Sequence, residues 1–202
     1  MPAAAGISSQ RWKCGNEVAM DCEPLRAGDM EIAERQLGRV VRGDARVAAR
    51  CPYGVVAVIA TPPLLPDGTP FPTLYWLSCP LLQRSVSGLE NGDFRESLRD
   101  RLESEPGFAE ALLRAEREYI ETREEWADEM RAAEKTRGYF SGREGIGGTV
   151  AGGLKCLHTH LAHYLAGGEN PVGAAVAAAL NGQQRRECAG ECEPFLREGT
   201  RR

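Results

Sequence analysis

Residues 55–60 read Val55-Val56-Ala57-Val58-Ile59-Ala60, an unbroken apolar run in which four side chains are β-branched. Such a run is typical of a strand that is covered on both faces. Further candidate strands flank it at residues 45–50 and 72–78. The proline-rich segment 61–71 contains an Asp67-Gly68 pair and favours an ordered loop over a helix. The three segments together predict a small antiparallel β-meander.

The rest of the chain is predicted to be mainly helical. Apolar spacing and the positions of glycine and proline predict helices at 29–39, 81–89, 93–137 with an interruption at Pro106-Gly107, 154–166 and 171–180. Region 93–137 is highly charged and has one narrow apolar stripe, which predicts a long amphipathic helix whose mixed charges form a solvated face. The alternative is an arm that binds a protein partner. The stripe consists of Phe108, Leu112, Ala115, Tyr119, Thr122, Trp126 and Met130.

Length and composition predict one α+β domain at residues 26–182, with flexible tails at 1–25 and 183–202. The chain has 202 residues, a hydrophobic share of 42% and a net charge of −4. This charge gives no reason to expect a nucleic-acid partner. The sequence shows neither a basic-then-apolar leader nor a run of about 20 apolar residues, so we expect no membrane insertion and a cytoplasmic location.

All three histidines fall within the stretch Cys156-Leu157-His158-Thr159-His160-Leu161-Ala162-His163. If this stretch is helical at about 100° per residue, His160 and His163 share a face with Cys156 and His158 points to the far side. A thiol and two imidazoles on one face indicate a reactive or metal-binding site. If the helix begins later and Cys156 lies in the preceding loop, His158 becomes a candidate instead.

Two more cysteines are predicted to lie near each other. Cys51 follows the first candidate strand and Cys79 follows the third, and each precedes a proline. In an antiparallel meander these two strand ends meet at the same edge of the sheet. Thiolate and imidazole ligands suit zinc, with iron as the alternative metal. The predicted ligands are Cys51, Cys79, Cys156 and His160, with His158 and His163 as alternates.

Other interpretations of the same residues stay open. The histidines can be satisfied inside the core, without a metal. Cys156 can be the nucleophile of a hydrolase with His158 as its acid or base, and Arg143 and Lys155 would then attract a small anionic or phosphorylated substrate. The glycine-rich segment 142–153 lacks the Gly-x4-Gly-Lys-Ser/Thr spacing of a nucleotide-binding loop.

The remaining cysteines lie near the two ends of the chain. They are Cys14, Cys22, Cys188 and Cys192. A metal clip formed by these four residues has only weak support, because a Cys-x3-Cys spacing in a charged tail is a poor ligand signature.

Several motifs resemble the bacterial domain of unknown function 501. They are Arg50-Cys51-Pro52-Tyr53-Gly54, the segment from Asp67 to Leu77 with Cys79-Pro80, the segment from Lys155 to His163, and Asn170-Pro171-Val172-Gly173. The resemblance covers roughly residues 30–180. It implies no established activity; actinobacterial members tend to be encoded near a septum-formation initiator and an exopolyphosphatase-type protein. That context implies an interaction protein of the division or envelope machinery as a further alternative, with helices 93–137 as the docking surface.

Overall fold

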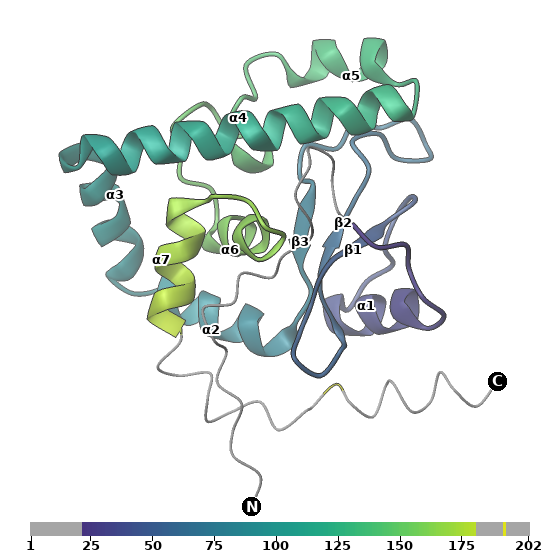
Figure 1. Ribbon diagram of the computed structural model, residues 1–202, viewed down its shortest axis with the longest axis horizontal. Helices are drawn as coiled ribbons and strands as arrows, with labels where there is room; N and C mark the ends of the chain where they lie inside the picture. Colours follow the sequence, from purple (N-terminus) through teal and green to yellow (C-terminus); the bar gives the residue numbers. More distant parts are fainter. Residues whose placement is uncertain (1–21, 181–191, 193–202) are drawn as a thin grey trace, which may run out of the picture.

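A computed structural model describes residues 22–180 and residue 192 (Figure 1). The architecture is α+β, as predicted: a three-stranded sheet is surrounded by helices. The elements in chain order are α1 (Asp29–Leu37), β1 (Arg46–Arg50), β2 (Val56–Ala60), β3 (Tyr75–Leu77), α2 (Pro80–Glu90), α3 (Phe94–Ser104), α4 (Pro106–Glu129), α5 (Ala133–Phe140), the 3-10 turn η1 (Ile146–Gly148), α6 (Leu157–Leu165) and α7 (Pro171–Leu180).

The sheet is the predicted antiparallel meander. β2 lies between β1 and β3, and both pairings are antiparallel. Every residue of β2 is buried, which confirms that this strand is covered on both faces. The predicted tails lie mostly outside the described residues. The backbone of Glu23 forms an antiparallel bridge with Val47, so the described chain already contacts β1 before α1 begins.

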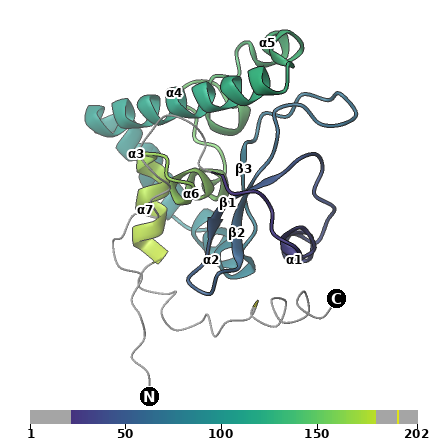
Figure 2. The ribbon, with the colours of Figure 1, turned by 45° about the vertical axis from the view of Figure 1, so that its right-hand side comes forward.

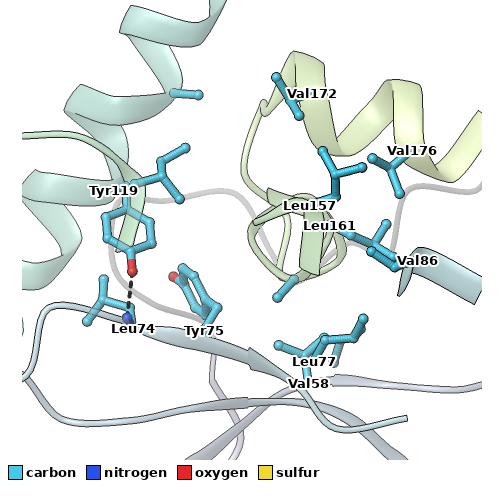
Figure 3. Packing of buried hydrophobic residues seen from close by; sticks show 14 of the residues in the cluster. Val58, Leu74, Tyr75, Leu77, Val86, Tyr119, Leu157, Leu161, Val172 and Val176 are labelled. Carbon is cyan, nitrogen blue, oxygen red and sulfur yellow. Dashed lines mark hydrogen bonds between the residues drawn. The ribbon is translucent and has the colours of Figure 1, made fainter. Parts of the chain in front are cut away.

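Two layers of helix cover the sheet. Helix α1 packs on one face, where Ala33 joins Val47, Val56 and Ile59 in a small apolar cluster. The opposite face packs against α6, and α4 and α7 complete the larger core (Figures 1 and 2). Figure 3 shows Leu157 of α6 directed toward Val172 and Val176 of α7, and Leu161 directed toward Val86 of α2. Helix α6, the carrier of the three histidines, is therefore a central element of the fold.

A tyrosine attaches the longest helix to the sheet. The hydroxyl group of Tyr119 in α4 accepts a 2.6 Å hydrogen bond from the Leu74 amide (Figure 3) and donates one of 3.1 Å to the Pro72 carbonyl. Its ring also meets Tyr75 edge to face, with 5.8 Å between centroids. Because both hydroxyl bonds go to backbone groups just before β3, the position of α4 is fixed relative to the sheet.

The apolar stripe of α4 is only partly as predicted. Tyr119 and Trp126 are buried, but Met130 is exposed. Glu116 and Arg123, predicted to lie on a solvated face, are only 2% and 1% exposed. This part of the prediction is wrong because both residues lie on the same side of α4 as Leu112 and Tyr119, where Gly152 contacts Glu116 and Phe140 of α5 covers Arg123.

No helix in residues 22–180 has both the length and the apolar composition required to cross a membrane. Docking of helices 93–137 on a protein partner stays a prediction.

Candidate metal centre at the start of helix α6

Helix α6 begins later than predicted. Its first residue is Leu157, and Cys156 is the N-cap residue with extended backbone angles. The preceding chain stays non-helical because it folds into turns, in which the Gly153 amide donates to the Val150 carbonyl and the Lys155 ammonium donates to the Gly147 carbonyl. With Cys156 outside the helix, His158 and not His160 becomes its neighbour.

Glu90 joins these two residues from another helix. It is the last residue of α2, and its Oε1 accepts a hydrogen bond from the Leu157 amide at the start of α6. A carboxylate at a helix N-terminus is stabilised by the free amides and the helix dipole. Its second oxygen, Oε2, lies 3.1 Å from His158 Nδ1. Glu90 therefore caps α6 and contacts the histidine at the same time.

The other nitrogen of His158 determines the position of the ring proton. Nε2 lies 3.1 Å from the Gln83 carbonyl oxygen and 3.3 Å from the Ser87 hydroxyl. A carbonyl oxygen can only accept a hydrogen bond. His158 Nε2 therefore carries a proton and donates a hydrogen bond to the Gln83 carbonyl. When the ring is neutral, the lone pair is then on Nδ1, the nitrogen that faces Glu90. Metal-binding histidines are commonly oriented in this way, through a hydrogen bond from the second nitrogen to a carbonyl.

The resulting group is compact and partly accessible. One ligand atom from each of Glu90, Cys156 and His158 lies within 4.8 Å of the other two, and across residues 22–180 and 192 no other set of three or more His, Cys, Asp or Glu residues meets this criterion. The side chains of His158 and Glu90 are 25% and 18% exposed. We call these three residues the Glu90 triad. An ion could reach it from solvent without unfolding the core.

Hydrogen bonds around Cys156 lower the pKa of its thiol, whereas burial and the charge of Glu90 act in the opposite direction. Burial by itself would raise the pKa of Cys156, but hydrogen bonding with His158 and Thr159 lowers that pKa below its ordinary value. The Thr159 hydroxyl lies 3.1 Å from the sulfur. Interaction with Cys156 raises the pKa of His158; burial opposes this shift, while Gln83 and Glu90 support it. Without a metal, these shifts favour a thiolate beside an imidazolium.

The other two histidines belong to the core. The side-chain nitrogen of Asn170 lies 3.2 Å from His160 Nδ1 and 3.3 Å from His163 Nδ1. The Asn170 oxygen accepts a 2.8 Å bond from the Gly173 amide and so caps α7. Burial lowers the pKa of His160 to about 4 and that of His163 to about 3. The structure therefore places both rings in the core beside Asn170, although His160 Nε2 is buried without a hydrogen-bond partner among the described residues.

Cys51 and Cys79 lie near each other but away from Cys156. Their amides donate to the carbonyls of Val55 and Ala57, at the start of β2, so they share one rim of the sheet. Cys79 caps the beginning of α2, whereas Glu90 ends that helix, about 16 Å away along its axis. The predicted set of Cys51, Cys79, Cys156 and His160 is thus not gathered at one place.

The clip of four cysteines near the chain ends stays a prediction, because the structure describes only two of the four. Cys22 packs against the main core, and the sulfur of Cys192 accepts a 3.5 Å hydrogen bond from Gln36. Cys14 and Cys188 lie outside the described residues.

The predicted anion-binding residues contact the protein's own backbone. Lys155 Nζ lies 2.8 Å from the Gly147 carbonyl oxygen, and the Arg143 guanidinium donates to the Tyr139 carbonyl. The Gly152 amide binds the carboxylate of Glu116, with distances of 2.9 and 3.1 Å to its two oxygens. One amide of the glycine-rich segment is therefore occupied by a side chain of α4.

Glu90 was not among the residues singled out from the sequence. One local signal is present: a carboxylate at the C-terminal end of a helix interacts unfavourably with the helix dipole, which suggests a partner elsewhere. That partner, Leu157, lies 67 positions away in the sequence, and only the packing of α2 on α6 brings the two together.

Fold and site together define a small α+β domain with a partly exposed Glu/Cys/His group at a helix start. The chain belongs to the family described as "Protein of unknown function (DUF501)", whose model matches residues 47–178. This match confirms the resemblance found in the sequence, and the matched region includes the whole Glu90 triad. No curated protein and no solved structure matches the chain.

Proposed function

We propose that this protein binds a divalent transition metal through Glu90, Cys156 and His158. The observation that carries the proposal is the approach of the three ligand atoms to within 4.8 Å of one another. The hydrogen bond from His158 Nε2 to the Gln83 carbonyl supports it, because it leaves Nδ1 as the ligand atom. Carboxylate, thiolate and imidazole together suit zinc better than magnesium or calcium.

A three-ligand site points to a reactive metal more than to a purely structural one, because structural zinc sites use four protein ligands. Zinc with an open position lowers the pKa of a bound water to about 7 and supplies hydroxide for hydrolysis. The protein's own groups would prepare the site: Leu157 orients the Glu90 carboxylate, Gln83 orients the His158 ring, and Thr159 contacts the Cys156 sulfur. We infer metal-dependent hydrolysis as the class of reaction.

The test is the metal content of protein purified without a histidine tag, incubated with zinc and desalted. We expect about one zinc per chain in the wild type, as for a single site of this kind. Cys156→Ser, His158→Ala and Glu90→Gln should each weaken binding at least about tenfold.

Cys79→Ser is the matched control, since Cys79 is also a partly buried cysteine at a helix N-cap. It should retain zinc. Equal zinc in Cys156→Ser and wild type would overturn the proposal, as would loss of zinc in Cys79→Ser alone.

A second candidate function is supported by the contrast between these two cysteines. Burial raises the pKa of Cys79 to about 11, whereas the pKa of Cys156 is lowered despite its burial. Cys156 would then act as a metal-free nucleophile, with His158 as its proton donor or acceptor. Iodoacetamide labelling at neutral pH separates the two functions: zinc protects Cys156 if it is a ligand, and leaves its rate unchanged if it is not.

A further inference from the structure

A pocket of about 590 Å³ lies between α4, α5 and the chain that follows α5. This volume falls within the usual range of small-molecule sites. None of its lining residues belongs to the Glu90 triad, so the argument does not depend on the proposed metal centre. The buried charged residues that line the pocket are Glu116 and Arg123. Its apolar lining includes Leu113, Ile120, Ala127 and Phe140.

Arg123 is the unusual residue of this pocket. It is almost completely buried, and no carboxylate in residues 22–180 forms an ion pair with it. Its Nη1 donates a 3.3 Å bond to the Arg143 carbonyl, and the guanidinium carbon lies 4.0 Å from the centre of the Phe140 ring. Its Nε is buried without any hydrogen-bond partner. A buried charge with an unused donor is costly unless something else satisfies it.

The geometry of the unused donor indicates the kind of group that fits. A guanidinium binds a carboxylate or a phosphate side-on through two parallel N–H groups, commonly those of Nε and Nη2. In Arg123, Nη1 already binds the Arg143 carbonyl, whereas Nε has no partner in the described chain. The remaining edge, which carries the buried Nε, has the donor geometry that an oxyanion requires.

Glu116 determines which chemical group can bind at the other end of the pocket. It precedes Arg123 by seven residues on the same helix, about 10.5 Å along the axis, and the two do not form an ion pair. Both of its oxygens lie near one amide, that of Gly152, so acceptor sites on the carboxyl group remain, and burial raises the pKa of Glu116. A second acidic group would be repelled there, whereas an amine or hydroxyl would be bound.

The other charged residues of the pocket are exposed. They are Arg117, Glu124, Asp128, Arg137 and Glu144. Because water screens charges of both signs at the mouth, the two buried groups decide which ligand is selected.

We propose that this pocket binds a small molecule that carries a carboxylate or phosphate at Arg123 and a hydrogen-bond donor at Glu116. Its carbon skeleton packs against the apolar wall formed by Leu113, Ile120 and Phe140.

Calorimetric titration tests this with three probes at matched ionic strength: 4-aminobutyrate, which has an acid and an amine; succinate, which has two acids; and inorganic phosphate. We expect saturable binding of 4-aminobutyrate and weaker binding of succinate. Phosphate should bind only if an oxyanion at Arg123 is sufficient for binding without a donor at Glu116. Arg123→Met should weaken 4-aminobutyrate binding at least tenfold. Glu116→Gln should reduce the preference for 4-aminobutyrate over succinate.

Arg114→Met is the matched control, because Arg114 is an exposed arginine of the same helix that does not line the pocket, and it should bind like the wild type. If Arg123→Met does not fold, Arg123→Lys replaces it in the titration. Lysine keeps the positive charge but lacks the two parallel N–H donors, so this variant should also bind 4-aminobutyrate more weakly than the wild type. Absence of saturable binding for all three probes in the wild type overturns the proposal. Wild-type affinity in the folded Arg123 variant also overturns it.

Discussion

Helix α6 carries histidine both at its beginning, where the side chain is partly exposed, and in its interior, where the side chains are buried. His158 at the beginning is partly exposed, contacts Glu90 and has a raised pKa. His160 and His163 are buried, share Asn170 and have strongly lowered pKa values. Three histidines within six residues thus divide into one group available for chemistry and two that stabilise the fold. Burial and hydrogen-bond partners, and not residue type, make this division.

The largest effect is expected at Asn170, which supports the structural part of α6. Asn170→Ala removes the cap of α7 and leaves His160 and His163 without their donor. A lost cap costs about 0.5–2 kcal/mol and each unsatisfied buried group about 1–3 kcal/mol, so we expect a loss of roughly 3–5 kcal/mol in unfolding free energy. Urea denaturation measures it. Asn170→Ser keeps a capping hydroxyl and should recover only part of the loss; wild-type stability in Asn170→Ser would show that the histidine contacts contribute nothing.

The pH dependence should also separate the histidines. For His160 and His163, folded pKa values of about 4 and about 3 lie below the unfolded value of about 6.5. Their contribution to stability is full above pH 6.5 and falls toward pH 4, by roughly 1.4 kcal/mol per pH unit for each histidine. The raised pKa of His158 acts in the opposite sense: its contribution is full below pH 6.5 and is lost as the pH rises through the folded pKa.

Histidine ring NMR between pH 4 and pH 8 tests these assignments. One ring should titrate above its ordinary value, and the other two should remain neutral until about pH 4. His158→Gln should remove the first titration and leave the others unchanged. Three rings that all titrate near pH 6.5 would contradict the division.

Close packing around His160 gives a smaller effect. A Cβ atom at Gly173 would lie 2.3 Å from the His160 carbonyl oxygen, which is too close for any side chain. We expect Gly173→Ala to cost about 1–3 kcal/mol, because α6 and α7 must move apart. Gly138→Ala is the control: this glycine is also helical, and a Cβ there meets nothing within 4 Å. Thermal unfolding should show Gly138→Ala neutral or slightly stabilised, and an equal loss in both variants would argue against close α6–α7 contact.

The smallest effect on stability is expected at His158. Its contact with Glu90 is partly exposed, so His158→Gln should change the unfolding free energy by less than about 1 kcal/mol. The same variant should bind zinc at least about tenfold more weakly. Paired urea and zinc-binding measurements check this, and a large loss of stability would mean that His158 is also a structural residue.

Local secondary structure could be predicted from the sequence, whereas contacts between distant segments could not. The strand at Val56–Ala60 was predictable because a β-branched apolar run of this length is typical of a strand covered on both faces. The partner of Cys156 was not, because it depends on where α6 begins, and a three-residue shift of the start exchanges His160 for His158. Glu90 and Arg123 were missed for the same reason: their surroundings are formed by tertiary contacts that no local pattern records.

The most direct test of the proposed centre is X-ray absorption at the zinc edge of the zinc-loaded protein, because it counts sulfur ligands. A site made of Glu90, Cys156 and His158 predicts one sulfur at about 2.3 Å, with nitrogen and oxygen ligands near 2.0–2.1 Å. It also predicts that this sulfur disappears in Cys156→Ser and persists in Cys79→Ser. Two or three sulfurs, or a sulfur that persists in Cys156→Ser, would place the metal on other cysteines and contradict the assignment.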